Sequence, residues 1–182
     1  MLKDFSMVVE EAVVFERIVP YMVNNITYSL SFMNDVFAKL RAESIYAITD
    51  VLSSLKTIPK SDTQIFVDYV FPTMVPRVSD SSLIVKIAVA ANLGKLAETA
   101  VRFLNYAETQ KEDPEFVLNT DGGSKMDYQR ELKLLQNTVQ EFTVSLLCDV
   151  DNAVKKVFVQ ESLTRLAVFF GKQKSKQRAV LM

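Results

Sequence analysis

One short pattern occurs three times in this chain, and it constrains the fold more than any other feature of the sequence. Each copy has an aspartate, an apolar residue five positions later and a basic residue at the sixth position. Every copy lies between two stretches whose apolar residues recur with the period of a helix. A chain with this internal repeat is expected to stack similar helical hairpins on one another. The aspartates are Asp35, Asp80 and Asp149, and the bases are Arg41, Lys86 and Lys155.

The chemistry of the pattern suits the turn between two antiparallel helices. An aspartate that follows the first helix can accept hydrogen bonds from free N–H groups at the start of the second. The base can then reach the aspartate of its own hairpin or of a neighbouring one. We therefore predict a structural ladder, and a binding strip is the alternative interpretation. The ladder residues are Asp35, Arg41, Asp80, Lys86, Asp149 and Lys155.

The spacing of the aspartates divides the chain into repeats. Asp35 and Asp80 are 45 residues apart, whereas Asp80 and Asp149 are 69 apart, so the second interval has 24 additional residues. The most polar and turn-rich segment, 108–126, is the natural place for them. We predict one array with repeat one at about 8–58, repeat two at 62–107, an exposed loop at 108–126, repeat three at 127–174 and a tail at 175–182.

Prolines are predicted to distort the first helices of repeats one and two. Pro20 lies in the first helix of repeat one, and Pro72 and Pro76 lie in that of repeat two. Pro20 precedes its aspartate by fifteen residues and Pro72 precedes its own by eight, which places seven extra residues within 24–33. These residues would form either two more helical turns or a bulge. The second helix of repeat two, at about 83–107, is predicted to bury Ile84, Ile87 and Leu96.

Composition supports long helices and excludes several classes of function. Four glycines and five prolines are few for an all-β chain built on tight turns. A net charge of −1 argues against a nucleic-acid-binding protein. The absence of histidine and the presence of one cysteine, Cys148, exclude an internal disulfide, His-dependent nucleophiles and an ordinary zinc site. We expect no catalytic residue, no cofactor and no metal site, and a buried, structural Cys148.

Two further signals bear on location. The first eleven residues carry four charges and lack the apolar stretch of a signal peptide. No run of about 18 apolar residues is long enough to span a membrane. These features favour the cytoplasm, with contact to a membrane surface only through a partner.

Several stretches of the chain resemble a known family. Residues 41–43, 65–66 with 69–72, and 96–104 (LAETAVRFL) are similar to the HEAT-repeat region of the regulatory subunit of class III phosphatidylinositol 3-kinase, also called phosphoinositide 3-kinase regulatory subunit 4. Residues 163–166 with 168–174 are similar to a later block of the same region. The resemblance covers roughly residues 16–174. It implies an all-α fold, namely an α-α superhelix that forms an open solenoid of HEAT-type hairpins.

The resemblance also implies a non-catalytic scaffold. In that family a kinase domain precedes the HEAT array and a WD-repeat propeller follows it. This chain has no Gly-rich loop, His-Arg-Asp or Asp-Phe-Gly motif, so no residue takes over the kinase activity. The implied partners are the lipid-kinase catalytic subunit and coiled-coil subunits, and the implied processes are endosomal or vacuolar sorting and autophagy, at the surface of those membranes. The chain begins inside a repeat and stops where another would start, so we expect a fragment or a divergent short product.

Two other functions stay open at this point. The chain could be a generic HEAT-repeat adaptor in another assembly, or part of an active Ser/Thr protein kinase whose kinase domain lies outside it. WD repeats encoded after this segment would favour the lipid-kinase scaffold. A kinase domain encoded before it would favour the enzyme.

Overall fold

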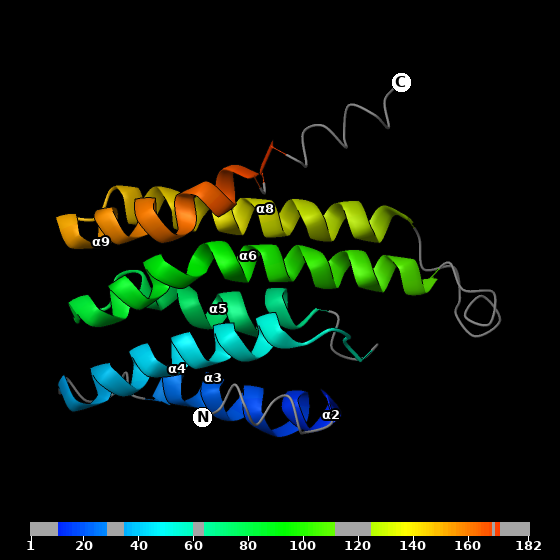
Figure 1. The fold of residues 1–182 in the computed structure, drawn as a ribbon, viewed down its shortest axis with the longest axis horizontal. Helices are drawn as coiled ribbons and strands as arrows, with labels where there is room; N and C mark the ends of the chain where they lie inside the picture. Colours follow the sequence, from blue (N-terminus) through cyan, green and yellow to red (C-terminus); the bar gives the residue numbers. More distant parts are fainter. Residues whose placement is uncertain (1–10, 29–34, 60–63, 112–124, 169, 172–182) are drawn as a thin grey trace.

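The computed structural model describes residues 11–28, 35–59, 64–111, 125–168 and 170–171, and the regular structure in these ranges is helical. The helices lie side by side in a layered stack (Figure 1). They form three hairpins, each with a first and a second arm. This arrangement confirms the expected all-α solenoid of stacked helical hairpins for the described part of the chain.

The arms of the hairpins have the following bounds. Hairpin one pairs α2 (Glu11–Val13), η1 (Val14–Ile18) and α3 (Val19–Tyr28) with α4 (Asp35–Ser54). Hairpin two pairs η4 (Phe66–Val70), α5 (Phe71–Met74) and η5 (Val75–Arg77) with α6 (Leu83–Lys111). Hairpin three pairs α8 (Lys125–Leu147) with α9 (Asn152–Val157) and η6 (Phe158–Leu163), and this second arm stays helical through Val168.

Helix α6 lies at the centre of the stack (Figure 1). The long helix α6 packs against α4 on one side and against α8, α9 and η6 on the other. On α4, Ile45, Ile48 and Leu52 recur at helical spacing and are fully buried. Burial of one such side chain contributes about 1.5–3 kcal/mol to folding. The amphipathic period of the sequence therefore drives neighbouring hairpins together.

Phenylalanines join the three hairpins. The ring of Phe103 on α6 lies 6.4 Å from that of Phe15 in hairpin one and 5.5 Å from that of Phe66 in hairpin two. The ring of Phe71 in hairpin two lies 6.0 Å from that of Phe142 in hairpin three. These centroid distances are those of favourable tilted aromatic pairs.

A π-helical turn precedes the proline in the first arm of hairpins one and two. The N–H of Val19 donates to the carbonyl of Val14, five residues earlier, and Pro20 follows directly. The N–H of Phe71 donates to the carbonyl of Phe66 in the same way, and Pro72 follows. Because proline has no N–H and its ring excludes the carbonyl four residues back, a widened turn accommodates it. The distortion predicted at these prolines thus takes the form of a π turn.

Several sequence expectations differ from the structure. Helix α6 continues to Lys111 and α8 begins at Lys125, so both ends of the predicted loop 108–126 are helical. Glu108, Gln110 and Lys111 are good helix formers, which explains why their polarity does not end the helix. Residues 112–124, the tail 175–182 and residues 29–33 of the predicted insertion lie outside the described residues.

Cys148 is a second correction. It was expected to be buried, but its side chain is exposed. The helix places Phe142 and Leu146 inward, four residues apart, and α8 ends at Leu147 just before the cysteine.

None of the helices in the described ranges is long and apolar enough to cross a membrane.

Candidate functional site

The first rung of the ladder joins hairpins one and two. Nη2 of Arg41 on α4 lies 2.9 Å from Oδ1 of Asp80, in the turn before α6, and Nη1 of Arg77 lies 3.0 Å from Oδ2 of the same carboxylate. The N–H of Ser82 also donates to Oδ1 of Asp80, at 3.0 Å. The three charged side chains are between 2% and 6% exposed. Asp80 therefore shapes its own turn and binds the base of the preceding hairpin.

The second rung joins hairpins two and three. Nζ of Lys86 on α6 lies 2.9 Å from Oδ1 of Asp149 and 2.5 Å from Oδ2 of Asp151. The N–H of Asp151 donates to Oδ1 of Asp149 at 2.7 Å. The turn before α9 thus repeats the geometry of the turn before α6, in which an aspartate accepts the N–H of the residue two positions later.

Charge and burial act in opposite directions on the ladder groups. Hydrogen bonds to Asp151 and Asp149 raise the pKa of Lys86 above its ordinary value, although burial opposes the shift. Burial would raise the pKa of Asp149, but the N–H of Asp151 and the ammonium of Lys86 lower it below its ordinary value. Burial lowers the pKa of Arg77, and Asp80 opposes that shift. Lys86 and Asp149 therefore favour the charged forms of each other.

Four of the six predicted ladder residues meet in these two rungs. In both rungs the base of one hairpin contacts the aspartate of the next hairpin. The side chain of Asp35 lies outside the described side chains, and among those described Lys155 makes no ion pair. We interpret the two rungs as joints between hairpins, because the charges of Arg41 with Asp80 and of Lys86 with Asp149 are paired and largely shielded from solvent.

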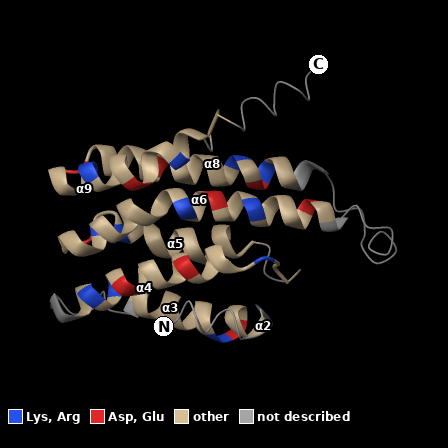
Figure 2. Cartoon of the chain, in the orientation of Figure 1, with Lys and Arg blue, Asp and Glu red and all other residues tan. Residues whose placement is uncertain are grey.

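A second row of contacts crosses the second arms, and the sequence patterns did not reveal it. Lys95 on α6 pairs with Asp50 on α4 at 2.6 Å, and Arg165 in hairpin three pairs with Glu98 on α6 at 2.7 Å. These side chains are between 34% and 51% exposed, so each pair contributes about 0–1 kcal/mol. A usable signal did exist, because Asp50 and Lys95 have opposite charges and lie 45 residues apart, one repeat interval. Figure 2 shows charges of both signs along α4, α6 and α8.

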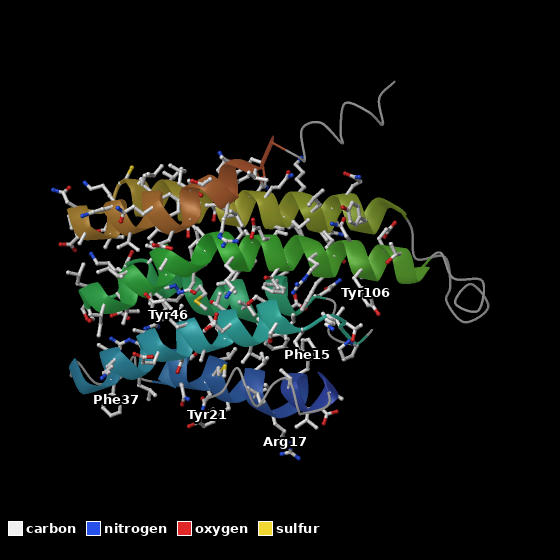
Figure 3. All side chains as sticks on the ribbon, in the orientation of Figure 1. Phe15, Arg17, Tyr21, Phe37, Tyr46 and Tyr106 are labelled. Carbon is white, nitrogen blue, oxygen red and sulfur yellow. The ribbon has the colours of Figure 1, made fainter. Side chains whose placement is uncertain are left out.

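An apolar groove of about 470 Å³ lies on the first arms of hairpins one and two. Figure 3 places Phe15 inside the stack, whereas Arg17 and Tyr21 point away from it. The lining has no charged side chain, so the groove suits apolar groups rather than ions. The groove is lined by Phe15, Val19, Pro20, Val23, Asn24, Thr27, Ile65 and Tyr69.

Among the described residues, no group of three or more His, Cys, Asp or Glu could hold a metal ion.

Comparison with known proteins gives a consistent set of relatives. The family model described as "PIK3R4-like, middle domain" matches residues 1–182. A probable serine/threonine-protein kinase vps15 of Dictyostelium discoideum is 30% identical over 167 residues, which cover 89% of this chain and 8% of the relative. Serine/threonine-protein kinase VPS15 of Arabidopsis thaliana is 25% identical over 194 residues, and that of Saccharomyces cerevisiae is 26% identical over 178 residues. Each of these two matches covers 96% of this chain and 12% of the relative, so the chain spans a small part of each relative's length.

Proposed function

Because the chain belongs to the PIK3R4-like middle-domain family, we propose that it is a non-catalytic scaffold segment of the regulatory subunit of the class III phosphatidylinositol 3-kinase complex. The family match over residues 1–182 is the observation that carries this proposal. The relatives are named as serine/threonine-protein kinases, and the matched region is 8–12% of the length of the three described above. In this proposal the kinase activity of those proteins resides outside the region that this chain matches.

The physical character of the array supports a scaffold of HEAT type. Stacked hairpins present extended surfaces on which several partners can bind side by side. Buried rungs between neighbours hold those surfaces in a fixed relative position. We propose the lipid-kinase catalytic subunit and coiled-coil subunits as the partners, at the periphery of endosomal and autophagic membranes, in sorting and autophagy. With a net charge of −1, nucleic acid is not among the proposed ligands.

Co-purification tests the proposal most directly. The tagged chain would be expressed with the class III lipid-kinase catalytic subunit, and in parallel with an unrelated lipid kinase. We expect retention of the class III subunit alone. Retention of neither, by a chain that circular dichroism shows to be helical and light scattering shows to be monodisperse, would contradict the proposal and favour an adaptor for another assembly.

Two variants separate a need for the stacked array from loss of a surface contact. Asp80→Ala removes the shared carboxylate of the first rung, whereas Arg165→Ala removes only a half-exposed pair. If the array acts as a rigid scaffold, Asp80→Ala should weaken retention of the lipid kinase and Arg165→Ala should not. If Asp80→Ala retains the lipid kinase as well as Arg165→Ala does, the stacking of the hairpins has no role in binding it.

A further inference from the structure

The second arms of the three hairpins share one surface, which runs along the side of the stack. Two ion pairs fix how the outer arms lie against α6 on this surface. Asp50 of α4 binds Lys95 at 2.6 Å, and Arg165 of hairpin three binds Glu98 at 2.7 Å. In the central part of α6 the residues that are at least partly exposed follow a single helical stripe. The stripe consists of Ile84, Ile87, Ala91, Lys95 and Glu98.

Hairpins one and three approach each other across a small residue of this stripe. One helical turn before the two ion pairs stand Tyr46 on α4, Ala91 on α6 and Glu161 in hairpin three. The hydroxyl of Ser162, the residue after Glu161, donates to the carbonyl of Ala90, the residue before Ala91, so these two turns lie side by side. Figure 3 shows Tyr46 between the ribbons of α4 and α6. The methyl group of Ala91 therefore lies between the larger side chains of Tyr46 and Glu161.

The charge around Tyr46 is negative. Burial raises the pKa of Tyr46 above its ordinary value, and the carboxylates of Glu43 on the same helix and of Glu161 across α6 raise it further. Both charged groups that act on the phenol hydroxyl are thus acids. Glu43 and Glu161 are exposed, and neither forms an ion pair with a described side chain. The bases Lys95 and Arg165 on this surface are already paired with other acids.

We propose that this surface binds an amphipathic helix of a protein partner, which places a lysine or arginine between Glu43 and Glu161, beside the ring of Tyr46. Two carboxylates attract such a cation, and the face of an aromatic ring adds to the attraction. Apolar side chains of the same helix cover Ile87 and Ala91, which lie one turn apart on the stripe. The inference rests on the proposed scaffold function, and it adds the face of the array that the partner contacts and the chemistry of the contact.

Charge reversal combined with co-purification tests this interface. The tagged chain would be co-expressed with the class III lipid-kinase catalytic subunit and the coiled-coil subunits, as the wild type and as the double variant Glu43→Lys with Glu161→Lys. Because reversal turns attraction of the cation into repulsion, the double variant should retain about tenfold less of a subunit that the wild type retains. The matched control is Glu16→Lys with Glu141→Lys, which makes the same change of net charge at exposed positions on the first arms. It should retain that subunit like the wild type.

A second variant fills the same position from within the chain. Ala91→Lys supplies a base between the two acids and covers the stripe, so it should also lower retention, whereas Ala12→Lys at an exposed position on a first arm should not. Circular dichroism should give the same helical signal for all variants, because every substituted side chain is at least partly exposed.

The outcomes separate this interface from the scaffold function itself. If the wild type retains a subunit and both the double variant and Ala91→Lys retain it equally well, the interface is overturned and the scaffold function stands. An equal loss in the control with Glu16→Lys and Glu141→Lys also overturns the interface, because a general effect of charge would then explain the result. A wild-type chain that retains no subunit overturns both proposals.

Discussion

The hydroxyl oxygen of Ser162 lies 3.0 Å from the backbone nitrogen of Gly94 and accepts its hydrogen bond. The same hydroxyl donates to the carbonyl of Ala90 at 2.6 Å, so it bridges two backbone groups of α6 that lie one helical turn apart. A Cβ atom at Gly94 would lie 2.9 Å from the carbonyl oxygen of Ser162 and 3.0 Å from its Cα. The close approach of hairpins two and three therefore depends on a residue without a side chain.

Gly94→Ala should destabilise the chain because backbone atoms, unlike a flexible side-chain end, would have to move. We expect the free energy of unfolding to fall by about 1–3 kcal/mol, as for other overpacked sites. Urea denaturation followed by circular dichroism measures it. Gly171→Ala is the matched control, since a Cβ there meets nothing within 4 Å. An equal effect of the two substitutions would mean that the contact with Ser162 is not the cause.

Asp80→Ala should cost more than any substitution in the exposed row of ion pairs. It removes the carboxylate that Arg41 and Arg77 share, and both guanidinium groups are almost fully buried. Loss of one partner from a buried pair typically costs about 3–5 kcal/mol. Asp50→Ala removes a 45% exposed partner of Lys95 and should cost no more than about 1 kcal/mol. Similar unfolding free energies for the two variants would refute this ranking.

The second rung predicts how stability depends on pH. The pKa of Asp149 is lowered in the folded state, so its contribution is present above the unfolded pKa of about 3.9 and is lost as the pH falls through the folded pKa. The pKa of Lys86 is raised, so its contribution is present below about pH 10.4 and is lost as the pH rises through the folded pKa.

Asp149→Asn should therefore lower stability at neutral pH and weaken its fall in acid. The measurement is the unfolding free energy from about pH 7 to pH 3, a range that includes the titration of an ordinary aspartate. The variant should lose less stability across this range than the wild type. Parallel curves for the two proteins would show that the charge of Asp149 does not contribute to the acid limb.

Arg102 is expected to hold the end of α4. Its Nη2 lies 3.2 Å from the carbonyl oxygen of Leu52 and 3.1 Å from that of Ser53, which are among the last carbonyls of that helix. Arg102→Met keeps the apolar stem of the side chain and removes the donors. We expect faster amide hydrogen exchange in the last turn of α4 and a loss of about 0.5–1.5 kcal/mol.

Lys56→Met is the control for Arg102→Met, because Lys56 is an exposed base just beyond the same helix. It should leave exchange in the last turn of α4 unchanged. If both substitutions accelerate exchange alike, a general loss of positive charge would explain the effect better than the hydrogen bonds of Arg102.

The fold class could be predicted because the local pattern and the apolar period agree. Ile45, Ile48 and Leu52 follow one helical face, and that face is the buried one. The period was less informative at the start of α6, where Ile84 was predicted to be buried but is 46% exposed, while Val85 and Val89 are buried. In that segment nearly every residue is apolar, so the sequence offers no contrast between faces.

The partners in the ladder could be predicted only in part. The local pattern left open whether each base contacts its own aspartate or a neighbour's, and the contacts with the neighbours' aspartates depend on how the hairpins stack. The contact between Gly94 and Ser162 joins residues 68 apart and has no repeating signal. It depends on how closely two helices pack, which follows from all their side chains together.

The two rungs have the same nitrogen–oxygen distance, although the intervals between successive ladder aspartates differ in length. Arg41–Asp80 and Lys86–Asp149 both measure 2.9 Å, yet the second pair of aspartates is separated by 24 more residues than the first. The first rung lies where α6 begins, and the second lies where α8 ends and α9 begins. Lys111 is the last residue of α6 and Lys125 is the first residue of α8, so both lie at the other ends of these two helices (Figure 1). The joint between neighbouring hairpins therefore keeps one geometry whether 45 or 69 residues separate its aspartates, so the stacking tolerates a large difference in the length of a repeat.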